Sequence, residues 1–238
     1  MEKILKSAAL PALAALLSFA FCVVSCVSEI TDPEQLRETI TTFHASFEQP
    51  VEAPGTRTYC RYDDGPQIRW HDDDKISIFN HSTGEEIYKF MGDTGDTTGD
   101  FEKDGSNVPE GEPTDLIYAV YPQQISRLKK DDQGYFLEID MPRYQNTENT
   151  DGASFSQFDN TMVSVGSTEN LSFRNVCGYL GIKMRGAEEM TTTDITLRGN
   201  NGEAISGVAE VRIDENGIPV CTMVDRNTEW DNPQEIKV

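Results

Sequence analysis

The sequence is poor in histidine, in basic residues and in motifs of known catalytic chemistry. It has 3 histidines in 238 residues, and 20 lysines and arginines stand against 41 aspartates and glutamates, for a formal net charge of -21. A chain this acidic, without a basic stripe, repels nucleic-acid phosphates, so we expect no nucleic-acid partner. It contains no Gly-x-Ser-x-Gly elbow, His-Glu-x-x-His pair or phosphate-binding glycine loop. We therefore expect no enzymatic activity and no cofactor.

What the sequence does have, at its beginning, is the pattern of an export signal. Lys3 and Lys6 precede an apolar stretch from Ala8 to Val24, which is too short and too rich in small residues for a membrane span. The stretch ends in Val-Val-Ser-Cys, which resembles the lipobox of bacterial lipoproteins. The resemblance implies that residues 1–25 are removed and that lipid on Cys26 holds the protein on the outer membrane, at the cell surface. A plain secretory signal and an uncleaved membrane anchor are the alternatives.

Cysteine is scarce once this signal is set aside. Cys22 leaves with the signal and Cys26 is acylated, so Cys60, Cys177 and Cys221 remain, at spacings that match no metal site. Each lies among apolar or β-branched neighbours, which favours buried free thiols. One disulfide among the three is the alternative in an oxidising compartment.

Short runs of alternating apolar residues dominate the chain after about residue 42. Alternation with period two is typical of strands that bury one face, and turn residues separate the runs. This pattern predicts an all-β fold, an antiparallel β-sandwich. The predicted strands are 43–47, 75–79, 115–122, 135–140, 175–184, 194–199, 207–213 and 219–224.

The same alternation predicts which side chains lie in the core, and the turn residues predict two hairpins. Asn201-Gly202 is a pair that tolerates the positive φ of a hairpin turn, and Asp214 to Gly217 repeats the device. The predicted core residues are Ile76, Ile78, Ile117, Ala119, Leu180, Ile182, Ile195 and Leu197.

Two acidic stretches are candidates for a cation site. Asp93, Asp96 and Asp100 lie on a glycine-rich loop where their oxygens could converge on calcium, but the loop lacks the glutamate that closes an EF-hand. The run from His71 to Asp74 is a similar candidate. We favour solvated loops for both and expect no metal.

The order of several motifs resembles that of the fimbrillin (Mfa-like) lipoproteins of Bacteroidales, over about residues 42 to 225. The resemblance implies transthyretin-like β-sandwich domains, usually two in a chain, and fimbrial subunits as partners. In pilus-forming members an arginine-specific protease trims the leader, and a strand from one subunit completes the next. The motifs are F-H-A-S-F-E, T-R-T, W-H-D-D-D-K-I-S-I-F, I-Y-A-V-Y-P, L-S-F-R-N-V-C-G-Y-L-G-I-K-M and L-R-G-N-N-G-E-A-I-S-G.

The expected organisation follows from these features. Residues 1–25 are the signal peptide, 26–41 an acidic tether, 42–225 a fimbrillin-like sandwich domain, and 226–238 a polar tail that is a possible start of a second domain. Proteolytic processing is expected after Arg37, in the tether, or after Arg57. We favour Arg37, because Arg57 is also explained as the beginning of a strand.

Two functions remain open at this point. The first is a non-catalytic structural, anchor or adhesion subunit of a fimbria-like surface assembly. We expect it to cap or anchor such an assembly, since the polar tail has too few apolar residues to serve as a donor strand. The second is a monomeric surface lipoprotein that binds a glycan or a host ligand, with Trp70, Trp230 and the tyrosines as stacking platforms.

Overall fold

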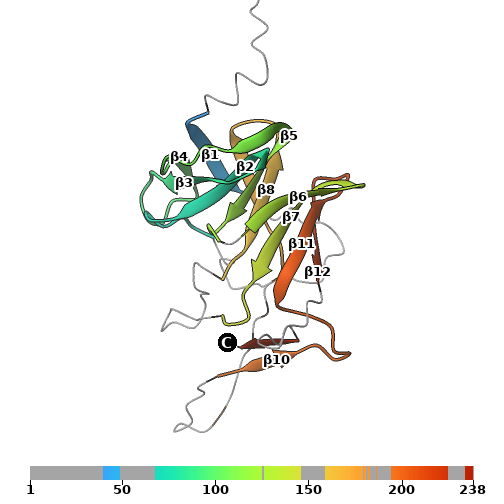
Figure 1. The fold of residues 1–238 in the computed structure, drawn as a ribbon. Helices are drawn as coiled ribbons and strands as arrows, with labels where there is room; N and C mark the ends of the chain where they lie inside the picture. The colour runs from blue at the N-terminus through green and yellow to red at the C-terminus, as the bar shows by residue number, and fades with distance from the viewer. Residues whose placement is uncertain are drawn as a thin grey trace, which may run out of the picture. The chain divides into compact units, whose positions relative to one another are not determined.

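Thirteen strands account for the regular structure of the residues that the structure describes. The computed structural model describes residues 40–48, 68–124, 126–145, 159–178, 180, 182, 186, 194–224 and 234–237 (Figure 1). No helix occurs in these ranges, which confirms the all-β prediction. The strands are β1 (Thr42–Phe47), β2 (Lys75–Thr83), β3 (Glu86–Phe90), β4 (Thr98–Lys103), β5 (Glu110–Tyr121), β6 (Ser126–Asp131), β7 (Gly134–Met141), β8 (Met162–Gly166), β9 (Asn170–Asn175), β10 (Thr196–Arg198), β11 (Gly207–Ile213), β12 (Pro219–Met223) and β13 (Glu235–Lys237).

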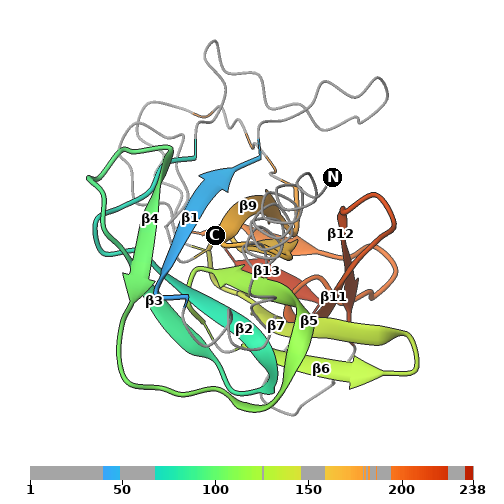
Figure 2. The ribbon, with the colours of Figure 1, turned by 90° about the horizontal axis from the view of Figure 1, so that it is seen from above.

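Seven of the strands close into a barrel in the order β1-β4-β3-β2-β5-β8-β9. Six of the seven pairings are antiparallel, and the seam between β1 and β9 is parallel. A second view shows β1 beside β4 (Figure 2). Closure leaves none of the seven strands with an unpaired edge. The predicted sandwich therefore has a closed barrel as one of its layers.

The barrel interior is filled mainly by aromatic side chains. Trp70 lies at its centre, 1% exposed, with the rings of Phe47, Phe90, Phe101, Tyr121 and Phe173 between 4.2 and 5.9 Å from it, centroid to centroid. Most of these contacts are edge-to-face, the arrangement that the ring quadrupole favours. The buried set is Phe43, Ala45, Trp70, Ile76, Ile78, Tyr88, Phe90, Phe101, Ile117, Ala119, Tyr121, Met162, Leu171 and Phe173.

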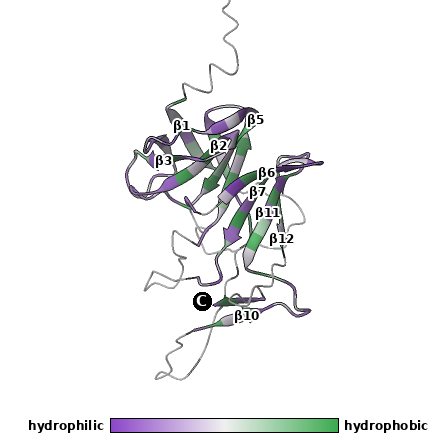
Figure 3. Cartoon of the chain, in the orientation of Figure 1, coloured by the Kyte–Doolittle hydropathy of each residue, from purple (hydrophilic) through white to green (hydrophobic). Residues whose placement is uncertain are grey.

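A second sheet, β12-β11-β7-β6, packs on the outer face of the barrel. Strand β5 has both faces buried: Ile117, Ala119 and Tyr121 point into the barrel, whereas Tyr118 and Val120 point toward the second sheet. The second cluster is mostly aliphatic, and Figure 3 shows hydrophobic positions recurring along β7 and β11. Its buried members are Phe79, Tyr118, Val120, Leu137, Ile139, Met141, Val163, Val176, Ala209 and Val211.

The core prediction is right for one half of its residues. Ile76, Ile78, Ile117 and Ala119 are each at most 1% exposed, and Ile195 and Leu197 are partly buried. The prediction that Leu180 and Ile182 lie in the core is wrong, because these side chains are 68% and 45% exposed. The strand of this region, β9 (Asn170–Asn175), lies earlier in the chain than the predicted strand 175–184, and Val176, directly after it, is buried in the second cluster.

One of the two predicted hairpins is confirmed. Asp214 to Gly217 joins the paired strands β11 and β12, with Gly217 at φ 77° and the Asp214 carboxylate accepting from the backbone N–H of Asn216 and of Ile218. The hairpin at Asn201-Gly202 is wrong, because the strands on its two sides belong to different sheets. β10 pairs instead with β13, from the segment expected to be a polar tail.

Candidate functional site

Strand β1 is the part of the barrel that lies nearest in sequence to the expected lipid anchor. It is hydrogen-bonded along both edges, antiparallel to β4 from Thr42↔Glu102 to Ser46↔Thr98, and parallel to β9 from His44↔Asn170 to Phe47↔Phe173. The residues just outside it extend the contact: Ile40 O accepts from the hydroxyl of Tyr88 at 3.0 Å. The chain thus enters the fold as an interior strand of the barrel wall.

The side chains of β1 alternate between the core and the surface. Phe43 and Ala45 are fully buried, and Phe47 stacks on Trp70 with centroids 4.2 Å apart. On the outer face, His44 Nδ1 lies 2.9 Å from Asp100 Oδ1 across the β1–β4 pair. These contacts make β1 a structural part of the aromatic core. We name β1 and its two pairings the anchor seam.

An ion pair fixes the end of the anchor seam. Glu48 pairs with Arg174, which lies in the partner strand β9, and Glu48 N donates to Phe173 O at 3.0 Å. Arg174 also donates from Nη1 to Gly217 O at 2.8 Å, in the hairpin of the second sheet. The guanidinium of Arg174 therefore links Glu48, at the end of β1, to both layers of the fold.

The turn before β2 covers the aromatic core. Trp70 N donates to Asp96 O at 2.8 Å, and Gly95 N donates to Trp70 O at 2.8 Å, so the turn is joined to the loop between β3 and β4. Trp70 was proposed as an exposed stacking platform, and this is wrong: the ring is buried because these bonds hold it over the barrel interior. Trp230 lies outside the described residues.

Asp74 is a buried carboxylate within the same turn. It is 3% exposed, accepts from the hydroxyl of Tyr121 at 2.9 Å, and accepts from His71 N at 2.7 Å. Burial raises the pKa of Asp74, and the two hydrogen bonds oppose this only in part. The prediction of a solvated run from His71 to Asp74 is wrong for Asp74, because nothing in four consecutive polar residues distinguishes the one that turns inward.

The three calcium candidates serve separate roles. The carboxylate of Asp96 accepts from Asp93 N at 3.0 Å within its own loop, whereas Asp100 lies in β4 beside His44. Among the residues that the structure describes, only His71, Asp72 and Asp73 bring three candidate ligand atoms within 4.8 Å of one another. All three are exposed.

His71 is tied to the carboxylates of this exposed turn. Its Nδ1 lies 2.7 Å from Asp73 Oδ1 and 2.9 Å from Asp72 Oδ1. The hydrogen bond to Asp73 raises the pKa of His71 above its usual value of 6.5, and the neighbouring negative charges act in the same direction. The role that these contacts give His71 is to pair with the carboxylates of its own turn.

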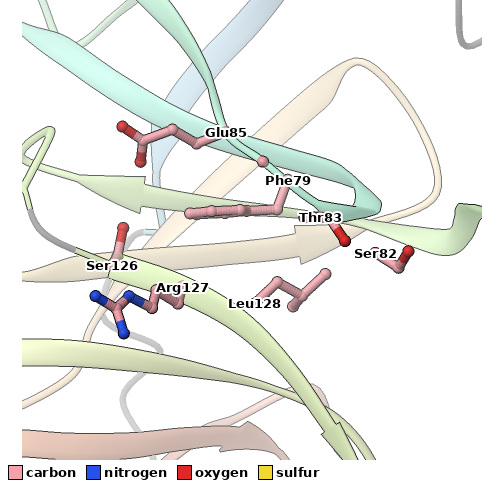
Figure 4. A pocket seen from close by; sticks show the side chains of 8 residues that line it. Phe79, Ser82, Thr83, Glu85, Ser126, Arg127 and Leu128 are labelled. Atoms are coloured by element: carbon pink, nitrogen blue, oxygen red, sulfur yellow. The ribbon is translucent and has the colours of Figure 1, made fainter. Parts of the chain in front are cut away.

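The structure contains a shallow hollow between the β2–β3 turn and β6, with a volume of about 320 Å³ (Figure 4). Burial raises the pKa of Glu85, which lines it. Phe79 and Leu128 supply an apolar floor, and Arg127 brings a cation. The full lining is Phe79, Ser82, Thr83, Gly84, Glu85, Ser126, Arg127 and Leu128.

The remaining predicted sites divide between described and undescribed parts of the chain. Cys26, Arg37, Arg57 and Cys60 lie outside the described residues. Cys177 was predicted to be buried, and this is wrong: it is exposed, because the chain leaves β9 two residues earlier, while Cys221 is partly buried.

Comparison with protein-family models, curated proteins and solved structures finds no match to this chain. Within the part of the chain that the structure describes, there is no helix of the length and apolar character needed to cross a membrane.

Proposed function

We propose that the protein is a lipid-anchored lipoprotein of the outer-membrane surface and a non-catalytic structural, anchor or adhesion subunit of a fimbria-like assembly. The observation that supports this proposal best is the anchor seam. The expected lipid on Cys26 is followed by a tether that ends at β1, and β1 is built into the barrel wall. At roughly 3.5 Å per residue, residues 26–41 allow the barrel to stand at most about 55 Å from its lipid.

The pairing of β1 also suits it to carry a mechanical load. A pull on the tether acts on a strand that is hydrogen-bonded on both sides and has Phe43 and Ala45 in the core. Extracting the strand breaks both rows of bonds and exposes the aromatic cluster to water. A subunit that holds others at a membrane needs such an attachment.

The position of β1 distinguishes the two proposed processing sites. A cut after Arg37 separates the barrel from its lipid and leaves β1 in place. A cut after Arg57 breaks the chain between β1 and the rest of the barrel. Only non-covalent contacts would then hold β1 in the barrel wall. Because removing β1 would leave Phe43 and Ala45 missing from the core, we propose Arg37 as the processing site. A copy cut there can act as a cap, whereas the anchoring role belongs to the uncut, lipid-bound copy.

The lipid anchor is tested on protein taken from the membrane fraction of its host. Mass spectrometry of the N-terminal peptide is expected to give an acylated Cys26, and the Cys26→Ser variant is expected to lose the modification and the membrane association. In the membrane-bound protein, an N-terminus at any residue other than Cys26 contradicts the proposal, because a copy cut after Arg37 has already left its lipid.

Assembly is tested by adding an arginine-specific protease to the purified protein, with Arg37→Lys and Arg57→Lys as matched variants. We expect release of a folded barrel that Arg37→Lys blocks and Arg57→Lys does not. Unboiled gels and electron microscopy should show no ladder or filament from this chain alone. Filaments formed without a second subunit contradict the capping role.

One exposed aromatic favours the second candidate, a monomeric lipoprotein that binds a glycan. Tyr144 is 60% exposed and has Arg143 and Lys237 near its ring, 5.6 and 5.8 Å from the centroid. An aromatic face beside two cations suits a sugar with an acidic group. Glycan-array binding that Tyr144→Ala abolishes would support this function, and an array without any signal would leave it without support.

A further inference from the structure

The end of β9 and the residues just after it lie against the β11–β12 hairpin of the second sheet. Arg174 Nη1 donates to Gly217 O in that hairpin at 2.8 Å. Two residues further on, Val176 is buried in the same apolar cluster as Val211, which is the register partner of Cys221 on β12. Cys221 itself packs against that cluster. A polar contact and a shared apolar cluster thus place the residues around Val176 near the β11–β12 hairpin.

The residue after Val176 is Cys177, and its thiol lies beside the thiol of Cys221. Both are free thiols, Cys177 exposed and Cys221 partly buried. They come from different layers of the fold, since β9 belongs to the barrel and β12 to the second sheet. Contact between two thiols, one of them open to solvent, is the arrangement from which a disulfide forms.

We propose that Cys177 and Cys221 form a disulfide that fastens the barrel to the second sheet once the protein reaches an oxidising compartment. The pairing itself rests only on the contacts above, whereas its occurrence in the cell rests on the proposed export of the lipoprotein. The bond would secure β12, an edge strand that pairs only with β11 in the second sheet.

The oxidant is a disulfide, either of a small molecule such as glutathione or of an oxidoreductase. The Cys177 thiolate attacks one sulfur of that disulfide, forms a mixed disulfide, and displaces the first thiol. Cys221 then loses its proton and attacks the Cys177 sulfur, which displaces the second thiol. Two protein S–H bonds are replaced by one S–S bond, and the oxidant is reduced to two thiols.

The local chemistry sets the order of these two attacks. Hydrogen bonding from the Cys221 thiol lowers the pKa of Cys177 to about 7, whereas the same interaction raises the pKa of Cys221. The exposed Cys177 is therefore the first nucleophile, and Cys221 is the resolving thiol.

The test begins with the full chain, purified in detergent, reduced, and then exposed to oxidised glutathione. After alkylation of free thiols, peptide mapping should show Cys177 linked to Cys221 in the wild type and in the Cys60→Ser control. Cys221→Ser should accumulate a glutathione adduct on Cys177, whereas Cys177→Ser should leave Cys221 reduced. Separate alkylation of the two thiols, or a bond from either one to Cys60, overturns the proposal.

Thermal unfolding provides a second readout. Closing the loop from Cys177 to Cys221 should raise the midpoint of the oxidised protein over the reduced protein by roughly 5–10 °C. A variant with both cysteines replaced by serine should show no difference between the two conditions. An equal midpoint for oxidised and reduced wild-type protein overturns the proposed role in fastening the sheets.

The final arm traps the thiols in intact cells with a membrane-permeant alkylating agent before lysis. We expect the Cys177–Cys221 bond to be already present in the exported protein. If it forms with glutathione but both thiols are alkylated in cells, the cellular disulfide is overturned. The failure then lies in the proposed export, and the pairing in the fold stands.

Discussion

The barrel interior and the interface between the barrel and the second sheet are both well buried, but they differ in construction. Inside the barrel, Trp70 and the aromatic rings around it fill a space that strands enclose on all sides. Between the sheets, mainly aliphatic side chains pack, and partly buried residues such as Leu128 and Cys221 border the cluster. The fold thus combines one core that strands enclose on all sides with another that is open at the edges of the second sheet.

Because of this difference, we expect the two layers to respond differently to the loss of a buried side chain. A closed barrel cannot contract around a lost side chain without disturbing pairings on every side, whereas a sheet that ends in edge strands β12 and β6 can move toward its partner layer. We expect the barrel to unfold as one unit and to be the less forgiving of the two regions.

The largest effect should come from Trp70→Ala, which empties the centre of the barrel. Loss of its packing should lower the free energy of unfolding by about 3–5 kcal/mol in a urea titration. Trp70→Phe is the control, and it should cost less, because it keeps an aromatic ring and also removes a buried Nε1 that has no partner among the described residues. A loss below about 1 kcal/mol for the alanine variant would contradict a closed core.

A matched pair of isoleucines compares the two cores directly. Ile76 on β2 faces the barrel interior and Ile139 on β7 faces the interface, and they are 0% and 1% exposed. Each change to alanine should lower the free energy of unfolding by roughly 2–5 kcal/mol. Ile76→Ala should be near the upper limit, because the cavity that it leaves collapses less. Urea unfolding of both variants measures this, and a larger loss for Ile139→Ala would reverse the comparison.

A pair of glycines tests how tightly the barrel wall is packed. Gly99 on β4 lies opposite Ala45, and a Cβ added there would meet the Phe90 ring at 2.6 Å. Gly99→Ala should therefore destabilise the protein by about 1–3 kcal/mol. Gly166 on β8 has no atom within 4 Å of an added Cβ, so Gly166→Ala should be neutral or slightly stabilising. Equal thermal midpoints for the two variants would contradict this packing.

The smallest effect concerns His71, at the surface of the turn that covers the barrel. Its folded-state pKa is raised above 6.5, so the stability that its charged form adds is complete below pH 6.5 and is lost as the pH rises through the folded value. An NMR titration should show Asp73→Asn lowering the His71 pKa more than Asp72→Asn, since the hydrogen bond to Asp73 is the larger cause. A greater shift from Asp72→Asn would show that Asp72, and not Asp73, is the main partner of His71.

The sequence was sufficient for features that depend on local alternation. Ile76, Ile78, Ile117 and Ala119 occupy strands with clear period-two patterns, and all four are buried. The turn at Asp214 to Gly217 was likewise recognisable, because its hydrogen bonds are formed within five consecutive residues.

Features that depend on distant pairing were not accessible in the same way. The parallel seam between β1 and β9 joins residues more than one hundred positions apart, as in His44↔Asn170. The exposure of Leu180 and Ile182, the inward turn of Asp74 and the contact of Cys177 with Cys221 all depend on where the sheets end. No local pattern encodes those positions.

The proposed role as a cap or an anchor requires β1 to be a permanent part of the barrel, since such a subunit keeps its own first strand. Hydrogen exchange of the full chain in detergent tests this strand by strand. We predict that the β1 amides exchange as slowly as those of β2 and β5, through global unfolding alone. If β1 exchanges as fast as the edge strand β12 while β2 stays protected, the strand is displaced on its own, and the anchor seam proposed here is contradicted.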